Sequence, residues 1–208
     1  MSAPMHTGFD RTYCYPNTHV LKNQLNIHDS DKLHQAERQL TSVRIHELRS
    51  TDNISSTFDT KHLKTIHKRI FQDLYDWAGK FRTVDIAKGN MFCRFMFMES
   101  QLDYIFSQLH KEKYLENIND INQMGERLAY YLSEINAVHP FREGNGRTQR
   151  ELIRKLAEHN GYHLDYSKIP DGALLQVSIK SFTQNYDDMT TLITNALTKQ
   201  NLTKPNTN

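Results

Sequence analysis

The sequence lacks several features that would indicate secretion or insertion into a membrane. Its 208 residues include only two cysteines, Cys14 and Cys93, without the close spacing of a metal site or a redox pair. This excludes a disulfide framework and favours a reducing compartment. No early apolar run resembles a signal peptide, and no window approaches the roughly 20 apolar residues that a membrane span needs. We therefore expect a cytoplasmic protein.

An excess of charge of one sign is also missing. Lysine plus arginine number 26 and aspartate plus glutamate number 24, a formal charge of +2 that does not suggest binding to nucleic acids or membranes. Hydrophobic residues make up 38% of the chain and charged residues 24%, which is typical of a globular protein and not of a disordered one. The length suffices for one domain with a real core.

The spacing of apolar residues predicts mainly helices. The clearest amphipathic stretch opens at Asp59 or Thr60, carries apolar residues three and four apart up to Leu74, and stops at Gly79. Further helices are expected at 20–25, 30–50, around 102–109, at 124–138, from about 146 to 161, at 171–182 and at 186–199. Alternation at 82–97, with turn residues at its centre, predicts one short β-hairpin. The expected class is all-α with a minor β element.

The segment 139–150, HPFREGNGRTQR, combines features that a phosphate-bearing ligand needs. Pro140 disfavours helical geometry at the residue before it, so His139 is expected at a helix exit. Two glycines flank Asn145 and allow a tight turn and close approach of a ligand. A new helix follows at once, and its unpaired N–H groups make the loop an anion site.

Charged residues of the same segment supply the remaining chemistry. Arg147 and Arg150 lie three apart on the first turn of the expected helix, where both can bind phosphate oxygens. Phosphates would repel Glu143 unless a cation bridged them, and Mg²⁺ is the natural bridge. His139 can take the proton from an attacking hydroxyl. Each residue alone is more often a cap, a turn or a solvated charge, but their joint occurrence in this order favours nucleotidyl transfer.

Two other nucleotide motifs do not fit. After Gly144-Asn145-Gly146 the chain has Gln149 at the position where the GxGxxG motif requires glycine, and no strand is expected before this segment. No GxxxxGK[ST] loop occurs anywhere in the sequence. Phe141 is interpreted as an apolar anchor that locks the loop onto the core.

The segment 139–150 resembles the Fic signature, HxFx[D/E]GNGRxxR, at every specified position. The stretch from Phe58 to Lys88-Gly89 also resembles Fic proteins, and residues 15–23 are similar to the start of the bacterial toxin and secreted-effector branch. The resemblance, over about 15–165, implies the Fic fold, a helical bundle with a small β-hairpin flap beside the active site. It divides the chain into a polar segment 1–14, a Fic domain 15–200 with its catalytic core at about 58–165, and a polar tail 201–208.

The resemblance implies a protein adenylyltransferase of the bacterial cytoplasm, which moves AMP from ATP to a Tyr, Ser or Thr hydroxyl of a target protein. His139 would be the base and Glu143 the Mg²⁺ ligand. The implied nucleotide-binding residues are Lys88, Gly89, Arg142, Glu143, Gly144, Asn145, Gly146, Arg147 and Arg150. The flap, comprising Lys88, Gly89, Asn90, Met91 and Phe92, would hold the target by strand addition. The alternative is a structural hairpin whose phenylalanines only fill the core.

Similar Fic proteins are restrained by a helix bearing [S/T]xxxE[G/N], and no such motif occurs here. Outside the signature only Glu116 is followed by Gly or Asn, and the residue four before it is Glu112. A separate antitoxin that carries this helix is therefore favoured over an unregulated chain. Three alternatives remain open: a secreted, host-directed effector domain of a longer protein, transfer of another phosphate-containing group, and a non-catalytic interaction module.

Overall fold

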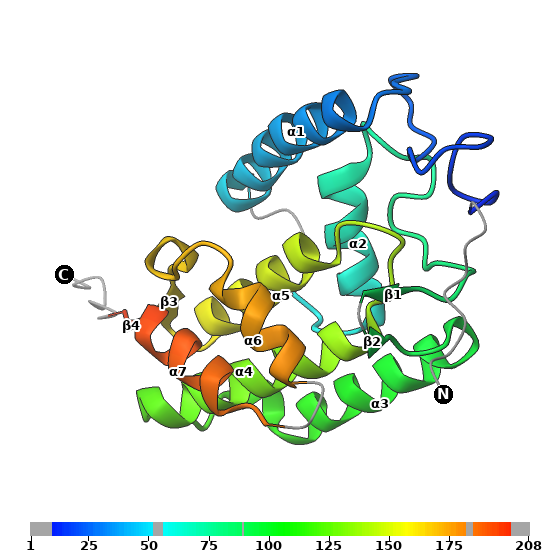
Figure 1. Ribbon diagram of the computed structural model, residues 1–208. Coiled ribbons are helices and arrows are strands. Elements are labelled where there is room, and N and C mark those ends of the chain that lie inside the picture. The colour runs from blue at the N-terminus through cyan, green and yellow to red at the C-terminus, as the bar shows by residue number, and fades with distance from the viewer. Residues whose placement is uncertain (1–9, 52–55, 89, 182–184, 201–208) are drawn as a thin grey trace.

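The structure, a computed structural model, describes residues 10–51, 56–88, 90–181 and 185–200. Seven α-helices and two small antiparallel sheets occur within these ranges (Figure 1). The helices are α1 (Ser30–Thr51), α2 (Thr60–Phe71), α3 (Met98–Lys111), α4 (Ile121–Val138), α5 (Asn145–His159), α6 (Ala173–Ser181) and α7 (Asp187–Ala196). The strands are β1 (Ala87–Lys88) with β2 (Asn90–Met91), and β3 (Tyr162–Leu164) with β4 (Leu197–Lys199). The expected helical class is confirmed.

Helices α4 and α5 form the centre of the bundle. Helix α4 packs against α3, α5 and α7, and α5 packs also against α2 (Figure 1). Asp120 caps α4, because its carboxylate accepts the backbone N–H groups of Asn122 and Gln123. At Gly125 of α4, a Cβ atom would lie 2.0 Å from the Thr194 hydroxyl oxygen of α7. Glycine is therefore what lets these two helices approach so closely.

Helix α2 supports the loop that joins α4 to α5. Asp59 caps this helix by accepting the N–H of His62 at 2.7 Å. The predicted apolar positions of α2, Leu63, Ile66 and Ile70, are all buried. Farther along α2, the ring of His67 stacks on Phe141 of the loop with a centroid distance of 3.8 Å. Phe141 is 1% exposed and is thus the anchor that the sequence suggested.

His67 is held in one neutral tautomer. Its Nδ1 accepts the N–H of Gly79 at 2.8 Å. The Nε2 atom therefore carries the hydrogen and donates to the carbonyl oxygen of Glu143 at 3.0 Å. Burial lowers the pKa of His67 to about 3, because the charged ring would be cut off from water. This buried histidine links the turn after α2 to the loop before α5.

The expected helix at 20–25 is wrong. Leu21 instead forms an isolated antiparallel bridge with Cys14. The side chain of Asn23 bonds to the backbone of Leu21 and of Ile27, and Asn26 has a positive φ of 53°. Asparagine side chains compete in this way for backbone groups that a helix would use, and the segment turns instead of coiling.

The structure differs from two further expectations, one for a hairpin and one for a helix. The hairpin expected over 82–97 is reduced to β1 and β2, with two residues in each strand. The guanidinium of Arg82 binds the carbonyls of Val84 and Cys93, which a longer ladder would use. The helix expected over 186–199 ends at Ala196, and β4 continues the chain to pair with β3. Residues 1–9, Gly89, 182 and 201–208, which the predicted segments include, lie outside the described residues.

We expect acid to destabilise the fold through His67. Its folded pKa of about 3 lies below the ordinary value of 6.5, so the unfolded chain binds a proton that the folded chain does not. The stabilisation is complete above pH 6.5 and is lost as the pH falls toward 3, by at most about 1.4 kcal/mol per pH unit. Urea unfolding at pH 7, 6 and 5 measures this slope. His67→Gln should reduce the slope, and an equal slope in both proteins would contradict the assignment.

Candidate active site

The loop between α4 and α5 is closed by the side chain of Asn145. Its Oδ1 accepts the N–H of Phe141 at 2.8 Å, and its Nδ2 donates to the Phe141 carbonyl at 2.7 Å. Gly144 has a φ of 80°, and a Cβ atom there would lie 2.1 Å from the ring of Phe71. Only glycine fits this position, because both the backbone angle and the space exclude a side chain. Helix α5 starts directly afterwards, at Asn145, one residue before the expected start at about 146.

His139 ends α4 in an unusual backbone conformation. It is the C-cap residue, with φ 50° and ψ 59°, and its N–H donates to the carbonyl of Ile135. A left-handed conformation is uncommon outside glycine, and such residues cluster at functional sites. The buried side chain of Arg82 donates to the His139 carbonyl at 2.9 Å and to the Val138 carbonyl. This bracing fixes where the histidine ring points.

The His139 ring is neutral and offers a proton-accepting nitrogen. Its Nδ1 lies 3.3 Å from the carbonyl oxygen of Asn136. Because a carbonyl only accepts, Nδ1 carries the hydrogen and Nε2 keeps a free lone pair. Burial, together with the positive charges of Arg82 and Lys88, lowers the pKa of His139 to about 4. The ring also stacks on Phe92, with a centroid distance of 3.8 Å.

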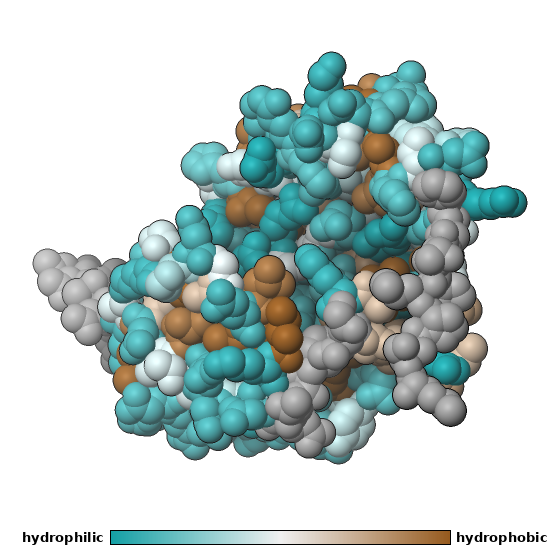
Figure 2. Space-filling model, viewed as in Figure 1, coloured by the Kyte–Doolittle hydropathy of each residue, from teal (hydrophilic) through white to brown (hydrophobic). Residues whose placement is uncertain are grey.

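A pocket of about 890 Å³ opens beside this histidine. The residues expected from the sequence that line it are Lys88, Phe92, His139, Arg142, Glu143, Asn145, Gly146 and Arg150. Gly144, Met91 and Arg147 do not line it, although they lie close by in the chain. Helix α6 forms part of its wall through Leu174 and Leu175. Hydrophobic side chains gather over α6 in Figure 2, where Leu175 and Ile179 are both 53% exposed.

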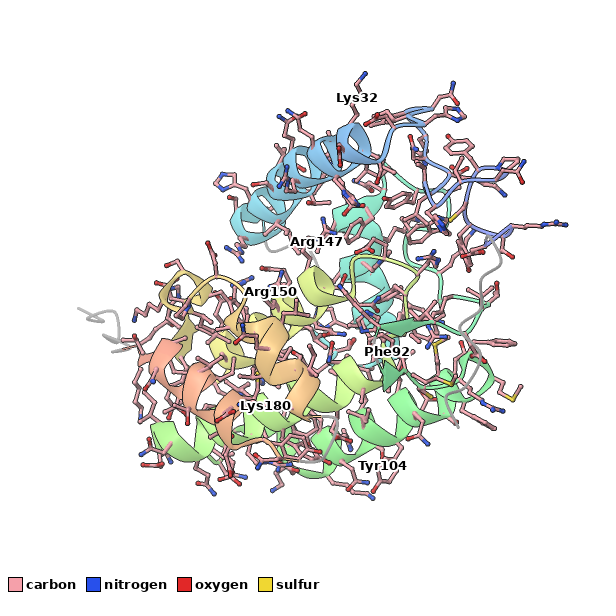
Figure 3. All side chains as sticks on the ribbon, viewed as in Figure 1. Lys32, Phe92, Tyr104, Arg147, Arg150 and Lys180 are labelled. Atoms are coloured by element: carbon pink, nitrogen blue, oxygen red, sulfur yellow. The ribbon has the colours of Figure 1, made fainter. Side chains whose placement is uncertain are left out.

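The two signature arginines have different surroundings, although both lie on the first turns of α5 (Figure 3). The Arg150 guanidinium makes no hydrogen bond or ion pair with any of the residues that the structure describes. Burial lowers its pKa. A cation that is partly removed from water and unpaired favours the arrival of an anion. Arg150 lines the main pocket and also a second pocket of about 660 Å³ beside α1.

Arg147 is already engaged with neighbouring elements. Its Nη2 donates to Glu37 of α1 at 2.5 Å, and its Nη1 donates to the Thr41 hydroxyl at 3.2 Å. The guanidinium also lies over the ring of Phe71, 4.8 Å from the centroid. Arg147 lines only the second pocket. Thus the structure brings Arg150, and not Arg147, to the pocket that holds His139.

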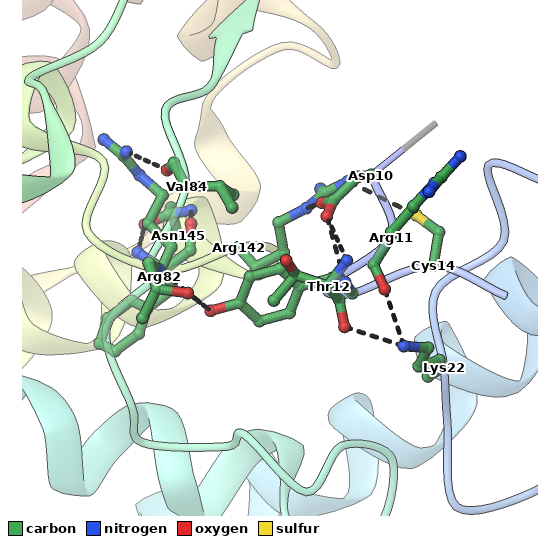
Figure 4. A network of polar contacts seen from close by, with 12 residues as sticks. Asp10, Arg11, Thr12, Cys14, Lys22, Arg82, Val84, Arg142 and Asn145 are labelled. Atoms are coloured by element: carbon green, nitrogen blue, oxygen red, sulfur yellow. Dashed lines mark hydrogen bonds and ion pairs between the residues drawn. The ribbon is translucent and has the colours of Figure 1, made fainter. Parts of the chain in front are cut away.

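Two further charged residues of the signature have separate partners. The carboxylate of Glu143 accepts the N–H of Gly144 at 2.8 Å, and its side chain is 47% exposed. Arg142 donates through Nε to Asp10 at 2.8 Å (Figure 4). Across residues 10–51, 56–88, 90–181 and 185–200, no group of three or more His, Cys, Asp or Glu side chains could hold a metal ion. A divalent ion beside Glu143 would therefore need oxygens from a bound ligand and water, as Mg²⁺ often does.

The flap is short and sits against the histidine. Strands β1 and β2 pair Ala87 with Met91 and Lys88 with Asn90. Phe92 is buried against His139, whereas Phe95 is 41% exposed, so only the first of these phenylalanines fills the core. Gly89 lies outside the described residues. Strand addition by a target stays a prediction.

Sequence reasoning missed three polar residues that shape the site. Arg82 lies in the second Fic-like stretch, and an arginine beside short apolar alternation was its only signal. Glu37 gave no signal, because its partner Arg147 is 110 positions away. Gln149 lines the main pocket and is 2% exposed, and its Nε2 has no hydrogen-bond partner among the described residues.

In the part of the chain that is described, no helix is long and apolar enough to cross a membrane.

Comparisons with known proteins show what this chain is similar to. Residues 57–157 match the model of the Fic/DOC family. The chain is 42% identical over 195 residues to the protein adenylyltransferase VbhT of Bartonella schoenbuchensis, covering 93% of this chain but only 40% of the length of VbhT. It is 36% identical to the probable protein adenylyltransferase y4lH of Sinorhizobium fredii, covering 81% of this chain and 86% of that protein.

The same fold occurs among solved structures. The crystal structure of the effector protein BepC of Bartonella tribocorum, with bound AMPPNP, superimposes with a TM-score of 0.86 at 23% sequence identity. The match covers 91% of this chain and 98% of that one. The identity to y4lH over most of both sequences, together with the match to the family model, shows that the chain belongs to the Fic/DOC family.

Proposed function

We propose that the chain is a protein adenylyltransferase, which transfers AMP from ATP to a hydroxyl group of a target protein. One observation carries the proposal: a neutral histidine, a glycine-bounded loop at a helix N-terminus and an unpaired arginine line the same pocket. These are the base, the phosphate site and the cation that such a transfer needs. Relatives named protein adenylyltransferase, at 36% and 42% identity, support the same activity.

The transfer is one displacement at the α-phosphorus of ATP. The oxygen of the target hydroxyl attacks phosphorus, and its proton passes to the free Nε2 of His139. The bond from the α-phosphorus to the oxygen bridging to the β-phosphate breaks, and pyrophosphate leaves with that electron pair. The protein contributes positioning, stabilisation of the phosphate charge and one proton transfer.

The remaining roles follow from where each residue lies. Arg150 and the first N–H groups of α5 bind phosphate oxygens. Glu143 would hold Mg²⁺, which would supply further neutralisation of the phosphate charge. Lys88 lines the pocket from the flap and borders both the nucleotide and the target. Arg142 contributes less directly to binding of the nucleotide, because its guanidinium is paired with Asp10.

The proposal includes a separate antitoxin that restrains the enzyme in the bacterial cytoplasm. Arg150 is shared between the main pocket and the pocket beside α1. A glutamate of another protein that entered the second pocket would reach this unpaired cation and deny it to the nucleotide. Glu37, the carboxylate of α1 in that pocket, is committed to Arg147. The resemblance to Fic proteins implies that a restraining glutamate lies on a helix bearing S/T-x-x-x-E-G/N, and we propose that the antitoxin supplies this helix.

His139→Ala should abolish transfer while ATP still binds. Loss of the base lowers the rate by at least about 100-fold, whereas the phosphate loop and Arg150 are untouched. The experiment incubates the protein with a bacterial lysate and ATP labelled at either the α- or the γ-phosphate. Label should enter protein from the α position only.

His163→Ala, at the exposed middle position of β3, is the matched control and should label like the unchanged protein. Labelling of protein by the His139→Ala variant would contradict the assignment of His139 as the base. Label from the γ-phosphate would instead indicate phosphoryl transfer.

Arg150→Gln should weaken binding of ATP roughly 10- to 100-fold, the usual worth of a hydrogen bond to a charged group. Binding of AMP should change little, because we propose that Arg150 binds the β- and γ-phosphates, which AMP lacks. Isothermal titration calorimetry measures both affinities. Arg69→Gln replaces an exposed arginine of α2 and serves as control. An equal loss for AMP and ATP would show that Arg150 does not select the distal phosphates.

The antitoxin can be tested through growth. Expression of the chain alone should slow bacterial growth, and expression of His139→Ala should not. Co-expression of a short neighbouring reading frame with the S/T-x-x-x-E-G/N helix should restore growth and give a complex that co-purifies. Normal growth with the unchanged chain alone, at matched protein level, would argue against a restrained toxin.

A further inference from the structure

Glu37 connects helix α1 to the back of the active-site loop. Its side chain is 8% exposed, and its Oε1 accepts Nη2 of Arg147 at 2.5 Å. Its Oε2 accepts the hydroxyl of Tyr75. Burial raises the pKa of Tyr75, and the nearby carboxylate raises it further, so the hydroxyl remains a donor. Both oxygens of this buried carboxylate are thus bound, which is the condition for keeping a charge away from water.

Arg147 lies between two carboxylates that compete for it. Nη2 is 2.5 Å from Glu37 but 3.6 Å from Oε1 of Glu143. Thr41 and the ring of Phe71 hold the guanidinium on the side of α1 and α2, as its place in Figure 3 also shows. Glu37 therefore has the stronger hold on the arginine, and the side chain of Glu143 stays half exposed in the main pocket.

Loss of Glu37 would leave Arg147 with one carboxylate in reach. Arginine does not give up its proton in proteins, so the guanidinium must find another negative partner. Glu143 is four residues earlier, just before the start of α5, and at this spacing its side chain is within reach of Arg147. A direct pair between the two would draw the Glu143 carboxylate away from phosphate oxygens.

We propose that Glu37 is a positioning residue of the active site, which holds Arg147 behind the loop and so keeps Glu143 open for a divalent cation bound with the nucleotide. The inference rests on the proposed function, because it assumes a nucleotide in the main pocket. It concerns only this chain's own residues: Glu37 holds Arg147 at 2.5 Å, so that Arg147 keeps only a longer contact of 3.6 Å with Glu143.

The test measures how Mg²⁺ affects binding of α,β-methylene-ATP, which cannot release pyrophosphate. Isothermal titration in MgCl₂ and in EDTA gives two affinities for each protein. Glu37→Gln should bind the analogue roughly tenfold more weakly in Mg²⁺, the usual effect of removing a partner that orients a metal ligand. Its affinity in EDTA should stay the same within error. Glu37→Asp, which keeps the charge, should recover part of the Mg²⁺-dependent affinity.

Two controls separate positioning from stability. Glu47→Gln removes a carboxylate of the same helix that pairs with Arg44 at the surface, and it should change neither affinity. Tyr75→Phe removes the other partner of Glu37 and should lower the melting temperature without a specific loss in Mg²⁺. An equal loss in Mg²⁺ and EDTA, no loss in either, or equal affinities of the Asp and Gln variants would overturn the proposal. Failure of the unchanged protein to bind the analogue would instead contradict the proposed function.

Discussion

The paired hydrogen bonds between the side chain of Asn145 and the backbone of Phe141 determine the geometry of the site. They close a loop of five residues, at 2.8 and 2.7 Å, between the end of α4 and the start of α5. The proton acceptor on His139 and the first N–H groups of α5 therefore face the same pocket. Gly144 completes this constraint, because its backbone approaches Phe71 too closely for any side chain. Most other polar contacts near the site hold this loop from outside.

Those outer contacts are buried polar groups with several partners each. His67 joins the Gly79 turn to the Glu143 carbonyl, and Arg82 gathers four carbonyl groups around the end of α4. Glu37 joins α1 to the same loop. Buried networks of this kind specify one arrangement because a displaced member would leave a polar group without a partner. Because this network keeps His67 neutral, the stability of the loop depends on pH.

The sequence predicted the parts of the structure that depend on neighbouring residues. The helix exit at His139, the turn at the glycines and the start of α5 follow from local backbone rules, and apolar spacing was enough to find α2. Pairings between distant segments were missed: the sheet of β3 with β4, and the contact from α1 to the loop. The local bridge from Leu21 to Cys14 was also missed. Spacing also made Arg147 and Arg150 equivalent. They differ because Glu37 and Thr41 of α1, 110 and 106 positions earlier than Arg147, bond to Arg147 and not to Arg150.

This difference explains how two adjacent arginines serve one site without competing for the same anion. Arg147 is neutralised by Glu37 and can hold the loop whether or not a ligand is present. Arg150 has no such partner in the described chain, so its charge remains available. A partly buried, unpaired cation is unfavourable by itself, and the fold tolerates it because the surrounding loop and helices are fixed independently. In the proposed function, Arg150 is consequently the position where a nucleotide, or a protein that excludes it, gains a charged partner on binding.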